Sequence, residues 1–136
     1  MADIAEVTNA LEQVRQSYAK ARAKHAPMHS AHEGYAVLAE EFDELWDEVK
    51  AWQPPGQYKP KPDCPTCAGK GSVWIGGQGG DYEDCHCILD TERESKANMR
   101  KEALHVAAMA LAFILEVCDK DTPPRLYDLL KGARHA

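Results

Sequence analysis

The chain has 136 residues and a formal net charge of −6, with 22 acidic and 16 basic side chains. This length fits one domain with a modest core, so a homo-oligomer is a reasonable expectation. The excess of acid argues against direct nucleic-acid binding, and no apolar run is long enough to cross a bilayer. The N-terminus lacks the basic and then apolar build of a signal peptide, so we expect a cytoplasmic protein whose clustered cysteines bind metal.

Residues 3–24 predict an amphipathic helix. Pro27 disfavours helical backbone for the residue before it, so this helix should stop ahead of that proline. Its apolar side chains recur at helical spacing: Ile4, Val7, Leu11, Val14 and Tyr18.

A second helix is predicted over residues 30–52. Ser30 should begin it, with Glu33 three residues later completing a capping-box pattern, and the prolines at 54 and 55 should end it. Leu38, Phe42, Leu45 and Val49 form an apolar stripe on one face.

An acidic stripe runs beside that apolar stripe. It consists of Glu41, Glu44 and Glu48, again at helical spacing. One interpretation is that these carboxylates are solvated or paired with Lys and Arg, as most charge runs are. The other is that they border a core, where a carboxylate without a partner is costly.

Residues 53–90 differ in composition from the rest, with five of the eight prolines, seven of the nine glycines and four of the five cysteines. Such a segment cannot sustain a long helix. Cys64 and Cys67 are separated by two residues and Cys85 and Cys87 by one, which is the ligand set of a structural, tetrahedral zinc site. His86 is an alternative ligand, and a redox dithiol is a competing interpretation.

From about Thr91 the pattern is helical again, and residues 101–117 are apolar almost all round, which indicates burial on more than one side. Residues 119–124 should stop this helix, a short closing helix should follow and end at Gly132, and Cys118 should be a buried core thiol. A polar line formed by Asn98, Glu102 and His105 crosses the apolar surface.

Carboxylates on two facing helices predict a divalent cation between them, because oxygen ligands suit Mg²⁺ or Mn²⁺ and leave positions open for water and phosphate oxygens. His105 has a second interpretation, as a histidine satisfied within the core.

Two phrases in the chain resemble a known family. Residues 40–44, EEFDE, resemble the EExxE element of the MazG-like, all-α nucleoside triphosphate pyrophosphohydrolases, and residues 29–50 followed by 100–117 look like its phage-type branch. Residues 64–71 also resemble the CxxCxGxG repeat of DnaJ-type zinc modules. The first resemblance implies hydrolysis of the α–β bond of (d)NTPs, leaning towards dGTP or dATP, with Mg²⁺ or Mn²⁺ held by glutamates. It also implies a dimer or tetramer.

Carried over by residue, Glu40, Glu41 and Glu44 match the first motif of the family and Glu102 the second. His105 stands where the family has aspartate, which favours Mn²⁺, or a ligand shell completed by Asn98 or Glu48. Glu40 and Glu41 are the candidates for a general base. Lys50, Arg100 and Lys101 are the candidate phosphate contacts, with surface charge as their alternative role.

The expected fold is therefore an all-α, MazG-like helical bundle completed by oligomerisation, one domain over residues 1–136. A zinc-binding loop, residues 53–90, is inserted between the two metal-carrying helices. The expected function is a metal-dependent (d)NTP pyrophosphohydrolase. A non-catalytic adaptor, with the zinc module as its recognition surface, is the alternative.

Overall fold

The computed structural model describes residues 1–54 and 56–120 of the chain. Most of them are helical, as the sequence predicts. The elements are, in chain order, α1 (Ile4–Lys24), α2 (Ala31–Ala51), β1 (Ser72–Ile75), β2 (Asp81–Asp84), α3 (His86–Phe113) and the π-helical segment η1 (Ile114–Cys118). The predicted closing helix before Gly132 lies outside the described residues.

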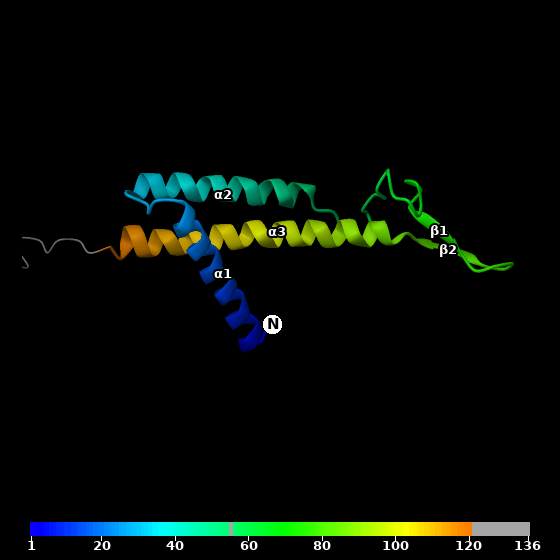
Figure 1. Cartoon of the computed structure of the whole chain (residues 1–136), viewed down its shortest axis with the longest axis horizontal. Coiled ribbons are helices and arrows are strands. Elements are labelled where there is room, and N and C mark those ends of the chain that lie inside the picture. The colour runs from blue at the N-terminus through cyan, green and yellow to red at the C-terminus, as the bar shows by residue number, and fades with distance from the viewer. Residues whose placement is uncertain (55, 121–136) are drawn as a thin grey trace, which may run out of the picture.

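Helix α3 is the axis of the molecule (Figure 1). Helix α2 runs beside it in the opposite direction, and α1 crosses it obliquely, so both N-terminal helices pack on α3. The hairpin β1–β2 lies beyond the N-terminal end of α3, away from α1. The seam between α2 and α3 therefore leads from the helical core to the cysteine-containing module, residues 53–90.

The predicted starts and ends of the first two helices are confirmed, with details that spacing does not reveal. Ser30 caps α2 by accepting a hydrogen bond from the amide of Glu33. The Glu33 carboxylate reaches back to the amide of His29 instead of that of Ser30, so the predicted capping box is displaced by one residue. A complete capping box is present on α1, between Asp3 and Glu6.

The region from residue 53 to 90 differs from the sequence prediction in two ways. Helix α3 begins at His86, five residues before the predicted Thr91, because its first turn belongs to the metal module. The module also contains a two-stranded antiparallel sheet, with Trp74 opposite Tyr82. The fold is thus mainly helical rather than entirely so.

The helical core is small and lies where α1, α2 and α3 meet. Its buried centre consists of Met28, Ala108, Met109 and Ala112. The alanines let the helices approach closely, as predicted for the apolar part of α3. Gly34 does the same on α2, since a Cβ atom there would lie 2.6 Å from Cδ2 of the Phe113 ring.

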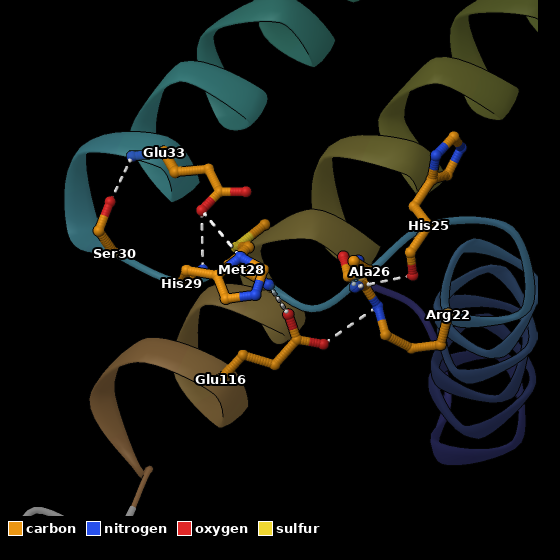
Figure 2. A network of polar contacts seen from close by, with 8 residues as sticks. All are labelled: Arg22, His25, Ala26, Met28, His29, Ser30, Glu33 and Glu116. Atoms are coloured by element: carbon orange, nitrogen blue, oxygen red, sulfur yellow. Dashed lines mark hydrogen bonds and ion pairs between the residues drawn. The ribbon is translucent and has the colours of Figure 1, made fainter.

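Glu116, on η1, fastens the connection between α1 and α2 to the end of α3 (Figure 2). One carboxylate oxygen accepts a hydrogen bond of 2.8 Å from the amide of Met28, and the other lies 3.0 Å from Nε of Arg22. The Tyr18 hydroxyl also donates to this carboxylate, at 3.2 Å. Burial and the nearby carboxylate raise the pKa of Tyr18. These contacts set where α2 begins and hence its register against α3.

Several predicted core residues are exposed in this single chain. Leu38 and Leu45 are half-buried, but Phe42 is 56% exposed and Val49 39%. The prediction of a buried thiol at Cys118 is wrong, because that cysteine lies on the solvent side of η1. The other large apolar side chains left exposed on the helices include Ile4, Val7, Leu11, Trp46, Ile114 and Leu115. The physical reason is that, among the described residues, α1 and α2 pack mainly against α3, so their other faces stay uncovered.

None of the helices in the described part of the chain combines the length and the apolar content needed to cross a membrane.

Candidate metal centres

The four cysteines predicted to bind zinc form one buried cluster. Their sulfur atoms all lie within 4.8 Å of one another. The Sγ atoms of Cys64 and Cys85 are 3.7 Å apart, and so are those of Cys67 and Cys87. Zn–S bonds of about 2.3 Å in a tetrahedron place neighbouring sulfurs roughly 3.7–3.8 Å apart. The ligand set and its spacing therefore fit a structural zinc ion.

Turns of the backbone bring the first cysteine pair together. The amide of Ala68 donates to the carbonyl of Cys64 at 2.8 Å, and the amide of Lys70 donates to that of Cys67 at 3.0 Å. Ala68 has a φ of 51° and Gly69 one of 81°, so the chain takes two left-handed residues in succession after the second cysteine. Glycine adopts this conformation without the cost that a Cβ atom brings.

Backbone amides favour the thiolate form of one of these cysteines, Cys64, whereas burial raises the pKa of the Cys87 thiol. Hydrogen bonds from the amides of Cys67 and Thr66 lower the pKa of the Cys64 thiol to about 6. A thiolate is the form that binds metal. His86 is outside the four-sulfur cluster, with its Nδ1 3.7 Å from Sγ of Cys85. It is placed to support a ligand rather than to replace one.

A second cluster lies in the seam between α2 and α3. Glu41 and Glu44 come from α2, and Glu102 and His105 from α3, with one ligand atom of each within 4.8 Å of the others. Glu102 is buried, at 7% exposure, whereas Glu41 and His105 are half-buried and Glu44 is exposed. The cluster is therefore closed on the α3 side and open to solvent at Glu44.

Lys101 and His105 each contact one carboxylate oxygen of the buried Glu102. The Nδ1 atom of His105 is 3.0 Å from one oxygen of Glu102, and Nζ of Lys101 is 2.9 Å from the other. The hydrogen bond from Lys101 lowers the pKa of Glu102, against the effect of burial. The same contact raises the pKa of Lys101.

Glu41 has the opposite environment. Burial raises its pKa, and the neighbouring carboxylates of Glu44, Glu102 and Glu40 add to the effect, while His105 opposes it. Its Oε2 is buried and has no hydrogen-bond partner among the described residues, with Nδ1 of His105 at 3.7 Å. A buried carboxylate oxygen without a donor is costly, and a divalent cation is a partner that would remove this cost.

The other predicted site residues lie at varying distances from this cluster. Glu40 is exposed beside Glu41, and Lys101 reaches the cluster through Glu102. Lys50 pairs instead with Asp47 at 2.6 Å on the solvent face, and Arg100 donates to Gln13 of α1 at 2.7 Å.

The predicted alternative ligands Glu48 and Asn98 line a neighbouring hollow. It has a volume of about 310 Å³ and lies between the end of α2, residues 58–59 and α3. Its walls include the buried Tyr58, which the sequence analysis did not single out. Tyr58 has no motif or helical spacing to mark it, since it stands in an irregular segment that only the folded chain brings to α3.

Comparison of the chain with protein-family models, with curated proteins and with solved structures gave no match.

Proposed function

We propose that this protein is a divalent-metal-dependent pyrophosphohydrolase that cleaves the α–β bond of (d)NTPs, in particular the purine deoxynucleotides dGTP or dATP. The products would be the nucleoside monophosphate and pyrophosphate. The observation that carries the proposal is the convergence of Glu41 and Glu44 with Glu102 and His105 in the seam between two helices. A helical core alone has no need of three carboxylates at one place, because like charges there repel.

The residues have distinct proposed roles. Glu41, Glu44, Glu102 and His105 would hold Mg²⁺ or Mn²⁺, which supplies charge to stabilise the phosphoryl oxygens and lowers the pKa of bound water. Glu40 or Glu41 would take the proton from the attacking water. Lys101 brings a positive charge to the open cluster, where a phosphate oxygen would bind.

The four-cysteine cluster has a structural role in this proposal. It would bind zinc and order residues 53–90, whose few apolar side chains cannot form a core of their own. The module also contacts α3 outside the metal cluster, through the ion pair of Lys61 with Glu94 at 2.9 Å. Zinc would therefore hold the segment that joins the two catalytic helices in place.

Incubation with each ribonucleoside and deoxyribonucleoside triphosphate, with Mg²⁺ or Mn²⁺, tests this function. Monophosphate and pyrophosphate are the expected products, and Glu102→Gln should lower turnover by about 10²-fold or more without unfolding the protein, because it removes charge from the cluster and keeps the size. Glu12→Gln on α1 is the matched control. Orthophosphate as the product, or near-normal turnover of Glu102→Gln, would contradict the proposal.

A homo-oligomer is part of the proposed assembly. The exposed apolar side chains of α1 and α2, such as Leu11, Phe42 and Trp46, would be covered by a second copy of the chain. Light scattering at micromolar concentration should give the mass of a dimer or a tetramer. A monomeric mass would leave these side chains in water and exclude this assembly.

One observation favours the alternative, an adaptor that binds through the zinc module. Trp74 and Tyr82 are 52% and 66% exposed on one face of the hairpin, with their rings in edge-to-face contact at 5.2 Å. Exposed aromatic pairs are frequent in recognition surfaces. This role does not require the carboxylate cluster, so the absence of pyrophosphate release would favour it over hydrolysis.

A further inference from the structure

A hollow lies beside the carboxylate cluster, in the seam between α2 and α3. Its volume of about 310 Å³ is at the lower end of the range of small-molecule sites, about 300–1,000 Å³. Glu48 lies one helical turn after Glu44, and Asn98 lies one turn before Glu102. Four residues of helix rise about 6 Å, so the hollow begins roughly that far from the cluster.

The helical core and the hollow lie on opposite sides of the carboxylate cluster, so a molecule bound at the cluster can extend along the seam in only one direction. On the side of the cluster towards the start of α2, the seam is filled by the helical core, where Leu38 packs against the buried cluster that contains Ala108. On the other side it opens into the hollow. A ligand whose phosphates lie at the carboxylates can extend along the seam only towards the zinc module.

The walls of the hollow offer the hydrogen-bonding groups and the apolar surface that a nucleoside needs. The Ser95 hydroxyl has no hydrogen-bond partner among the described residues. The Tyr58 hydroxyl accepts from the amide of Gln53 at 3.2 Å and keeps its own proton to donate. Asn98 offers an amide donor and a carbonyl acceptor, and Glu48 two acceptors. Ala51 and the Tyr58 ring supply the apolar surface between them.

The zinc module supports one wall. Tyr58 and Lys59 precede Pro60, which lies close to Gly71 and Ile88, since a Cβ atom on Gly71 would approach both side chains within 3.5 Å. Ile88 in turn packs on the cysteine cluster. The position of Tyr58 therefore depends on the folded module.

We propose that this hollow binds the base and sugar of the nucleotide, with Tyr58, Ser95 and Asn98 selecting the nucleoside and the zinc module holding Tyr58 against α3. The inference rests on the proposed function only for the placement of the phosphates at the cluster. It assigns Asn98 to the nucleoside and not to the metal.

Equilibrium binding separates these assignments. The probes are the α,β-methylene analogues of the deoxynucleoside triphosphates, which cannot be cleaved at that bond, and inorganic tripolyphosphate, which lacks a nucleoside. Isothermal titration calorimetry in the presence of Mn²⁺ would measure the affinity of the protein for each of these two kinds of probe. Asn98→Ala removes hydrogen bonds, and Ala51→Phe fills the hollow from an exposed position. Asn9→Ala, on the exposed part of α1, is the matched control.

Each hollow variant should weaken binding of the preferred methylene nucleotide by about tenfold, equivalent to about 1.4 kcal/mol, and reduce the differences among the bases. Asn98→Ala would do so by removing hydrogen bonds, and Ala51→Phe by occupying the space of the nucleoside. Tripolyphosphate should bind within about twofold of its original affinity. Equal weakening of both probes would place Asn98 at the metal and overturn the inference. Unchanged nucleotide binding in both hollow variants would overturn it too.

The outcomes also separate this inference from the proposed function. A protein that binds the methylene nucleotides through the hollow and cleaves none of the natural triphosphates has the nucleoside site without the hydrolase activity. A protein that cleaves them while both hollow variants remain unchanged has the activity without this site. A protein that binds no methylene nucleotide in the presence of Mn²⁺ has neither.

Discussion

The two clusters of potential metal ligands differ in almost every physical respect. The four sulfurs are closed off from solvent, with Cys85 at 0% exposure, and are held by backbone turns within a short stretch of chain. The carboxylate cluster is assembled from two helices and is open to solvent at Glu44. A closed, four-ligand site stabilises a fold, whereas an open one leaves positions for water and substrate.

The difference extends to what happens without a cation. In the carboxylate cluster, the ammonium group of Lys101 pairs with Glu102 and the His105 ring contacts its other oxygen, so the seam between the helices can persist without metal. Among the described residues, the partly buried apolar side chains packed on the cysteine cluster are Val73 and Ile88, too few for a core of its own. We therefore expect one site to be essential for folding of its module and the other to be exchangeable.

The largest expected effect comes from removing the cysteine ligands. Cys64→Ser with Cys67→Ser should abolish zinc binding, because structural zinc sites contribute about 10 kcal/mol or more of apparent free energy. Residues 53–90 should become sensitive to proteolysis, while α1, α2 and most of α3 remain helical. Metal analysis, circular dichroism and limited proteolysis measure these three effects.

Cys118→Ser is the matched control for that experiment, because Cys118 is exposed and lies outside the cluster. It should keep about one zinc ion per chain. Zinc retained in the double variant, or cleavage spread evenly over the helices, would show that the ligands or the limits of the module are wrong.

The next largest expected effect tests whether the cation at the carboxylates exchanges more readily than the zinc at the cysteines. Titration with a weak chelator such as citrate should stop turnover while zinc stays bound, since the carboxylate site is open and the sulfur site is buried. Turnover and zinc content would be measured on the same samples, and added Mn²⁺ should restore activity. Simultaneous loss of zinc and activity would instead mean that turnover depends on the sulfur site.

The two regions also differ in how far the sequence predicts them. The cysteine ligands and the ends of α1 and α2 depend on local spacing and on caps such as Ser30, which sequence analysis detects. The start of α3 was missed because Cys85 caps it without a side-chain hydrogen bond. The hairpin was missed because the glycine-rich turn at residues 76–80 was attributed to a loop.

The carboxylate cluster shows a different limit. Glu41, Glu44 and Glu48 are equivalent by helical spacing, and only the register of α2 against α3 brings the first two to Glu102 and leaves Glu48 at the hollow. That register depends on the long-range contacts of Glu116, which local patterns do not reveal. The 56% exposure of Phe42 is not predicted either, because helical spacing shows which face Phe42 shares but not whether another element covers that face.

A smaller effect is expected from His105→Asp. His105 is 39% exposed and lies near both Glu41 and Glu102, so it is not a core histidine. Aspartate there should shift the metal preference from Mn²⁺ towards Mg²⁺, because carboxylates suit the harder ion. Without metal, the added negative charge should lower the melting temperature by a few degrees.

His105→Asn is the control for this change, since it removes the imidazole without adding charge. Activity and melting temperature measured across Mg²⁺ and Mn²⁺ concentrations distinguish the two. An unchanged metal preference in the aspartate variant, with a lowered melting temperature at all metal concentrations, would exclude His105 as a ligand.

The smallest expected effect concerns Glu41→Gln, whose difference in melting temperature from the original protein should change sign when metal is added. Burial raises the pKa of Glu41 in the folded chain above its unfolded value, so its contribution to stability is present below the unfolded pKa and is lost as pH rises through the folded pKa. At pH 7 with chelator, Glu41→Gln should therefore melt a few degrees higher than the original protein, and the difference should vanish near about pH 4, where the carboxyl is protonated. Addition of Mn²⁺ should reverse the order, because only the carboxylate gains a metal bond. Thermal unfolding at both pH values, with and without Mn²⁺, tests the sign. A Gln variant that is less stable in chelator at pH 7 would show that the carboxylate of Glu41 supports the fold, and would make the second cluster as structural as the first.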